Sequence, residues 1–321
     1  MSSLVDRTRP FWLPGLNAVS GPQREGFGKW LLRGTYSMHS PVSIDKFSLV
    51  ITDSRPFLAG VAADCSRLAS AAIESISEAN QNARAPRATA WVLIRLYYAG
   101  YFAAHAILRT FGISIFQLES EHSEAVEEVA DVWGMLCNVG IRNGTYVCRY
   151  NSEIRTVECQ QARGGSGGTH EVVWAEFRRF VSNLASRVLS TSSADSIDQS
   201  VATKLGELEE NLCQCGRTSG NWLSYIRNQI TYRQQHGCWY PYTAGELRSE
   251  VLSLAATWRN DPMECPLIPT RSRPLKCFAT TIGCLLAWQR AIIEDMSERC
   301  PKGKSFLLFG PQAYLAHFGR A

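Results

Sequence analysis

The chain has 321 residues, of which 45% are hydrophobic and 19% charged, and its formal net charge at pH 7 is +4. This is an ordinary globular balance with room for one large domain or two smaller ones. The two longest apolar stretches are interrupted by residues such as Arg95 and Arg290, so neither predicts a membrane span. The first residues lack the continuous apolar core of an export signal, so we expect a cytoplasmic protein with no membrane partner.

The numbers of cysteines and arginines give two weaker indications, one about the cellular compartment and one about the kind of partner. The eleven cysteines are odd in number and irregularly spaced, which favours a reduced compartment over a disulfide framework. Only six of the 33 basic residues are lysine. Because the planar guanidinium group matches phosphate and carboxylate, an arginine-rich chain leans toward phosphate or interface recognition. High genomic GC content explains the same bias equally well.

The first half of the chain predicts a less regular N-terminal segment followed by helices. Residues 1–55 contain many Pro and Gly residues and two short strand-like runs, at 29–32 and 47–51, so we expect an irregular arm or small β element. Apolar residues then recur at helical spacing over 58–80. A second helix, expected over 86–111, is apolar or aromatic on both faces, which is typical of a central helix. An acidic helix is expected over 119–137.

The second half predicts a hairpin and then more helices. Two strand-like runs, 145–150 and 156–160, flank Asn151-Ser152 and predict a β-hairpin, and the glycine-rich run at 163–168 predicts a flexible loop. Further helices are expected over 170–189, 197–213, 222–235, 244–259 and 277–298. The fold class is therefore mainly α: a helical bundle with an inserted β-hairpin and a less regular N-terminal segment. We divide the chain into 1–55, a helical core at 56–260 with an insertion at about 141–169, and a Pro-rich linker with a C-terminal helical segment at 261–321.

One segment, residues 221–241, concentrates polar and aromatic side chains more than any other. On a helix Asn228, Tyr232 and His236 fall at i, i+4 and i+8 and share one face, with Arg227 at its edge. These four are the candidate catalytic residues. The residues expected to contact RNA or a partner are Tyr225, Arg233 and Trp239. The plainer interpretation is a packing helix, with the aromatic residues buried and the arginines in solvent.

Two parts of the chain resemble the HEPN domain family. They are residues 95–108, RLYYAGYFAAHAIL, and residues 226–232, IRNQITY. HEPN domains are small helical bundles found in toxin–antitoxin, phage-defence and RNA-processing proteins, and in nucleotide-binding proteins without nuclease activity. The resemblance covers about residues 86–241. It implies a homodimer in which an Arg, often followed by Asn, and a nearby His cleave RNA without a metal ion or any other cofactor.

The chain departs from this family pattern at one position. Where the pattern places histidine, the sequence has Tyr232. Cleavage by a ribose 2′-hydroxyl requires a base near neutrality and a cation on the developing phosphorane charge. Arg227 supplies the cation, but a free tyrosine titrates near pH ~10 and is a poor base. The departure favours an RNA-binding or regulatory HEPN-like component of a bacterial antiviral defence or toxin–antitoxin system, with cleavage only if His236 acts as the base.

Two alternatives remain. One is a non-catalytic subunit that docks another protein of the same system, partly through the arm at Phe11 and Trp12. The other is a structural zinc site, because Cys213, Cys215, His236 and Cys238 offer four ligands, although their spacing is not that of a common zinc finger. His105 is expected to be a core residue near the motif helix. The chain contains no phosphate-loop, zinc-protease or nucleophile-elbow motif.

Overall fold

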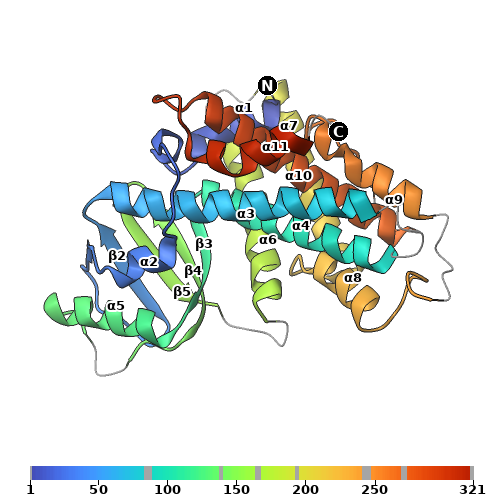
Figure 1. Cartoon of the computed structure of the whole chain (residues 1–321). Coiled ribbons are helices and arrows are strands. Elements are labelled where there is room, and N and C mark those ends of the chain that lie inside the picture. Colours follow the sequence, from blue (N-terminus) through green and yellow to red (C-terminus); the bar gives the residue numbers. More distant parts are fainter. Residues whose placement is uncertain are drawn as a thin grey trace.

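The computed structural model describes residues 2–82, 89–136, 140–162, 168–191, 195–240, 247–268 and 273–318. Over these ranges the chain is mainly α-helical, and an antiparallel sheet lies at one end of the helical assembly (Figure 1). The fold class is therefore confirmed. The helices are α1 (Ser3–Thr8), α2 (Phe27–Leu32), α3 (Ser54–Asn82), α4 (Thr89–Thr110), α5 (Ser120–Val132), α6 (Gly168–Leu189), α7 (Ser196–Leu212), α8 (Trp222–Thr231), α9 (Leu247–Ala255), α10 (Pro274–Glu298) and α11 (Pro311–Phe318). The strands are β1 (Tyr36–Ser37), β2 (Lys46–Ile51), β3 (Ile113–Leu118), β4 (Gly144–Asn151) and β5 (Thr156–Gln161).

The centre of the molecule is built around α4. It lies alongside α3, and α6, α8 and α10 also pack against it (Figure 1). Its side chains are buried on nearly every side, as the apolar pattern on both faces predicts. Within the described ranges it is the single helix long and apolar enough to cross a membrane, and 72% of that window is buried inside the fold. This burial is that of a core helix, and α4 thereby brings its tyrosines next to α6 and α8.

The predicted hairpin forms the middle of a larger sheet. The strand order is β1-β2-β5-β4-β3, and each neighbouring pair is antiparallel. The hairpin β4–β5 and the strand at β2 are confirmed, whereas β3 follows α4 directly and was not expected. The predicted strand at residues 29–32 is wrong, because this segment is part of α2. Its Phe27, Trp30 and Leu31 are all buried, at helical rather than alternating spacing.

Several element ends differ from the predictions. The acidic helix α5 ends at Val132, and the helix expected over 244–259 is described as α9 followed by a short 3₁₀ turn, Ala256–Arg259. The predicted glycine-rich loop at 163–168 lies, apart from its last residue, outside the described residues. The first residues of the helices expected at 86 and 244 also lie outside them.

One hydrophobic cluster joins buried residues from all three predicted segments of the chain. The N-terminal segment is fixed to the C-terminal one. Ser20 pairs with Ser305 in an isolated β-bridge, and the Arg9 guanidinium donates to both carboxylate oxygens of Asp295 at 2.9 and 2.8 Å. The division into three segments stays a prediction. Within the described residues, the three segments share one hydrophobic core.

Candidate functional site

The motif helix α8 is shorter than predicted. It ends at Thr231, and beyond it Gln234 and His236 have φ values of 51° and 67°, in the left-handed region. A helix cannot continue through such residues. Asn228, Tyr232 and His236 therefore do not lie on one helical face, which corrects the geometry expected from the sequence.

Arg227 lies between two tyrosines. Its Cζ is 5.1 Å from the ring centroid of Tyr97 on α4 and 5.9 Å from that of Tyr232, and its Nη1 donates to the Tyr232 hydroxyl at 3.4 Å. The Arg227 Nε is buried and has no hydrogen-bond partner among the described residues. A cation over an aromatic face is held by the ring quadrupole. The guanidinium group is therefore positioned by rings rather than neutralised by a carboxylate.

Tyr97 connects this arginine to α6. The fully buried Tyr97 accepts a hydrogen bond from Trp174 Nε1 at 3.1 Å, and its hydroxyl lies 2.9 Å from His170 Nδ1. Burial raises the pKa of Tyr97, while hydrogen bonds from Trp174 and Ser224 act in the opposite direction. Tyr97 is thus a neutral phenol that holds together groups from α4, α6 and α8.

His170 is a neutral imidazole at this site. Burial, and then the positive charge of Arg227, lower its pKa to about 4. The Tyr97 hydroxyl and Nδ1 of His170 share a hydrogen bond in either tautomer of the imidazole, and the tautomer decides which of the two groups donates. The Arg227 site, defined as Arg227, Tyr97, His170 and Tyr232, therefore presents one cation and neutral polar groups.

His105 lies deeper in the same aromatic cluster. The Tyr101 ring contacts both imidazoles, with centroids 4.8 Å from His105 and 4.4 Å from His170. Burial, with the charge of Arg109, lowers the pKa of His105 to about 3, and its Nδ1 has no partner in the described part of the chain. His105 is a core residue, as expected, and the Tyr101 ring lies in contact with both His105 and the His170 imidazole of the Arg227 site.

The other predicted site residues lie beside this cluster rather than in it. His236 Nε2 is 3.0 Å from Gln229 Oε1, and Gln229 Nε2 donates to the Tyr225 hydroxyl at 2.8 Å. The pKa of His236 is lowered by burial alone. Trp239 donates to the Ile230 carbonyl at 2.7 Å. The side chains of Asn228 and Arg233 are exposed.

Sequence reasoning missed Tyr97 and His170 as members of the site. The tyrosine-rich run of α4 contains Tyr97 and was part of the family resemblance, so it indicated this region of the fold. The residues next to His170 in the sequence gave no sign that His170 belongs to the site. The two residues are 73 positions apart, and only the packing of α6 against α4 brings them together.

The four candidate zinc ligands do not assemble. Cys215 is exposed, Cys213 Sγ donates to the Thr218 carbonyl at 3.8 Å, and Cys238 is buried with Sγ 3.4 Å from the His236 carbonyl. Burial raises the pKa of Cys238 to about 11, which disfavours the thiolate that zinc requires. Among the described residues, one group comes close enough to hold an ion, and it does not include these four. It comprises Glu119, Glu121 and His122, at the capping box that begins α5.

No family model, no curated protein and no solved structure matches this chain. The HEPN resemblance therefore rests on residues 95–108 and 226–232 alone.

Proposed function

We propose that this chain is a cytoplasmic HEPN-like component of a bacterial antiviral defence or toxin–antitoxin system, and that it binds RNA phosphate at the Arg227 site. The observation that carries the proposal is the position of Arg227 against Tyr97, whose hydroxyl is hydrogen-bonded to His170. This places a cation, a phenol and an imidazole from three helices around one point. None of the three is a carboxylate that would repel a phosphate.

The charge balance of the site suits a phosphodiester. His170 is neutral at pH 7 and Arg227 is positive, so the site as a whole is cationic. The guanidinium fork matches phosphate oxygens. Tyr232 is 72% exposed beside the arginine and offers a ring for base stacking. These are the groups that single-stranded RNA recognition uses.

Binding is better supported than cleavage. A general base works best with a pKa near the operating pH, whereas burial and the charge of Arg227 lower the pKa of His170 to about 4. His236, the base expected from the sequence, is held by Gln229, and the charge of Arg227 acts on the pKa of His170 but not on that of His236. If the protein does cleave RNA, His170 is the better-placed imidazole.

The binding proposal is tested with a fluorescently labelled single-stranded oligoribonucleotide and fluorescence anisotropy. Arg227→Ala is expected to weaken binding about tenfold or more, since a hydrogen bond to a charged group contributes about 1.5–3 kcal/mol. Arg55→Ala is the matched control, because Arg55 is 89% exposed and is paired with Asp53 elsewhere on the surface. Equal affinity of wild type and Arg227→Ala would show that RNA does not bind here.

The nuclease form is tested separately. Wild type, Arg227→Ala, His170→Asn and His236→Asn are incubated with RNA in the presence of a chelator, and the same genes are expressed in a bacterial host. Cleavage and growth inhibition that require Arg227 and His170 but not His236 are the expected result for an active enzyme. Intact RNA and equal growth with all four proteins would exclude cleavage and leave the binding form.

A second candidate, a non-catalytic interaction subunit, is favoured by exposed aromatic side chains near α8. Trp91 is 57% exposed and touches Trp239, and Tyr240 is 83% exposed. The arm expected to dock a partner is instead packed, because Trp12 is buried and the ring of Phe11 lies under the Arg187 guanidinium at 4.2 Å. Trp91→Ala and Tyr240→Ala are expected to abolish homodimers, or a complex with the product of a neighbouring gene, in analytical ultracentrifugation. An unchanged assembly would remove this candidate.

A further inference from the structure

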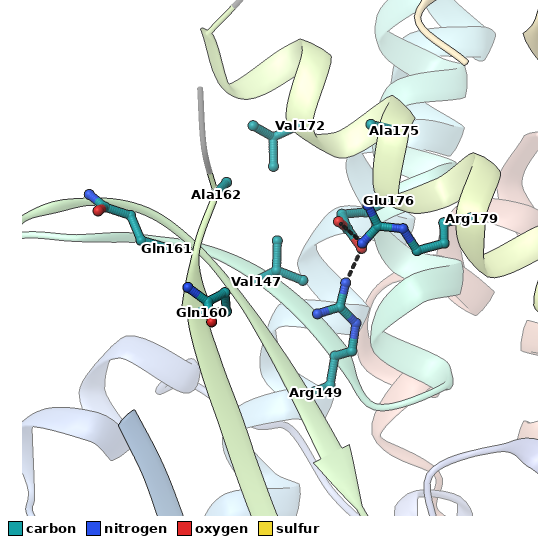
Figure 2. Close-up of a pocket in the computed structure, with 9 residues that line it drawn as sticks. All are labelled: Val147, Arg149, Gln160, Gln161, Ala162, Val172, Ala175, Glu176 and Arg179. Carbon is teal, nitrogen blue, oxygen red and sulfur yellow. Dashed lines mark hydrogen bonds and ion pairs between the residues drawn. The ribbon is translucent and has the colours of Figure 1, made fainter. Parts of the chain in front are cut away.

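A groove separates α6 from the face of the sheet next to it. Figure 2 shows the lining side chains of β4 and β5 on one wall and those of α6 on the other. The cavity has a volume of about 380 Å³, which is within the range of small-molecule sites. Its lining residues are Val147, Arg149, Gln160, Gln161, Ala162, Val172, Ala175, Glu176 and Arg179.

Three charged side chains, Arg149, Glu176 and Arg179, lie together in the lining of this groove (Figure 2). The Glu176 side chain is 11% exposed and accepts from Arg149 on one oxygen and from Arg179 Nη1 on the other, the latter at 2.8 Å (Figure 2). Each arginine uses one nitrogen for this contact and has further N–H donors. One carboxylate thus holds two guanidinium groups together, and the trio keeps a net positive charge.

A second cavity continues from the same trio. It has a volume of about 400 Å³ and also contains Arg149, Glu176 and Arg179 in its lining. The rest of its wall contains the apolar Ile113, Phe180 and Leu184 together with Asn183, Ser186 and the exposed Arg187. We call these two neighbouring cavities, which share the three charged side chains in their walls, the channel, and the second cavity its chamber.

We propose that this channel binds a nucleotide, or another phosphate monoester joined to a flat apolar body. The phosphate lies against Arg149 and Arg179, and the base occupies the chamber beside Phe180. Phosphate suits a pair of guanidinium forks held at fixed positions. The chamber supplies the apolar contact area that most small-molecule sites use for affinity.

This site is separate from the Arg227 site. On α6, His170 and Trp174 face the tyrosines of α4, whereas Ala175 and Arg179 line the channel. A helix turns about 100° per residue, so these two sets lie on different sides of α6. The proposal therefore does not depend on RNA binding at Arg227.

Isothermal titration with AMP, inorganic phosphate and adenosine tests the proposal. AMP is expected to bind, and both inorganic phosphate and adenosine are expected to bind more weakly because each makes only part of the contacts. Arg179→Ala is expected to weaken AMP about tenfold by removing one charged donor. The Arg179 side chain is 60% exposed, so this variant should stay folded, which circular dichroism verifies.

Two control variants place the site. Arg55→Ala removes an exposed ion-paired arginine elsewhere and should bind AMP like the wild type, and Arg227→Ala measures any AMP that binds at the Arg227 site instead. The proposal is overturned if AMP gives no binding heat, if Arg179→Ala binds AMP as tightly as the wild type, or if phosphate alone binds as tightly as AMP. Loss of AMP binding in Arg227→Ala but not in Arg179→Ala would move the nucleotide to the other site.

Discussion

The hydroxyl of Tyr97 and Nδ1 of His170 are 2.9 Å apart, and this single hydrogen bond joins the middle of α4 to the first turn of α6. Trp174 donates to the same hydroxyl from one turn further along α6. The phenol oxygen is thus a buried junction for two side chains. Its removal affects both the packing of α6 and the orientation of His170.

Tyr97→Phe should destabilise the protein by about 1–3 kcal/mol, because Trp174 Nε1 would become a buried donor without an acceptor. The free energy of unfolding in urea measures the change. Tyr98→Phe is the control, since Tyr98 is the next residue on α4 and its hydroxyl has no hydrogen-bond partner among the described residues. Equal free energies of unfolding for the two variants would show that the Tyr97 hydroxyl does not hold Trp174 by a hydrogen bond.

Acidification should destabilise the fold through His105 and His170. Their pKa values are about 3 and about 4 in the folded chain, against about 6.5 in an unfolded one. Between these values the unfolded chain binds more protons, so the stabilisation is complete above about pH 6.5 and is lost as the pH falls toward about 4. His105→Gln should reduce the loss of unfolding free energy between about pH 7 and about pH 5. The exposed His39→Gln should leave that loss unchanged, and a His105→Gln profile identical to the wild type would refute the assignment.

Two glycines in helices should respond to alanine with opposite signs. A Cβ at Gly283 of α10 would lie 2.6 Å from Thr257 Oγ1 and 3.1 Å from the Leu254 carbonyl, so overpacking should cost about 1–3 kcal/mol. At Gly206 of α7 a Cβ meets nothing within 4 Å, so the better helix propensity of alanine should stabilise by about 0.5–1 kcal/mol. Thermal unfolding of Gly283→Ala and Gly206→Ala measures both. A stabilised Gly283→Ala would show that α10 does not approach residues 254–257 this closely.

Thiol reactivity should follow burial. Among the ten cysteines described, Cys215 is exposed, Cys213 is partly buried and the remaining eight are buried. In a titration with a thiol reagent, Cys215 should react first, and the eight should react only after denaturant is added. Cys215→Ser removes the fast phase. Rapid modification of several thiols in that native variant would contradict the packing.

The sequence predicted the elements whose signals are local. The apolar periodicity from Leu58 onward and the two-sided pattern of α4 each predicted a helix correctly. β3 was missed because its short apolar run, beginning at Ile113, follows the helix stop at Gly112 without a separate signal. The sequence of residues 29–32 is equally compatible with a strand and with a helix. The packing of Trp30 against Phe27 and Phe57, which the sequence does not show, is what favours the helix.

The candidate site was predicted in part for the same reason. Arg227 and Tyr232 are close in sequence, and they do contact each other. The helix was expected to reach His236, but left-handed backbone at Gln234 cannot be read from a glutamine. The pairing of Tyr97 with His170 depends on how α6 packs on α4, and a single sequence contains no record of that contact.

The bridge between Ser20 and Ser305 also affects the order in which parts of the chain become packed during synthesis. The segment that contains Leu4 and Val5 is translated before α10, which supplies part of the surface against which it packs. Until α10 has been made, these apolar side chains lack part of the surface that covers them, and incompletely covered apolar segments are prone to aggregation. The segment around α1 should therefore become protected from proteases only after α10 has been made, although it precedes α10 in the chain.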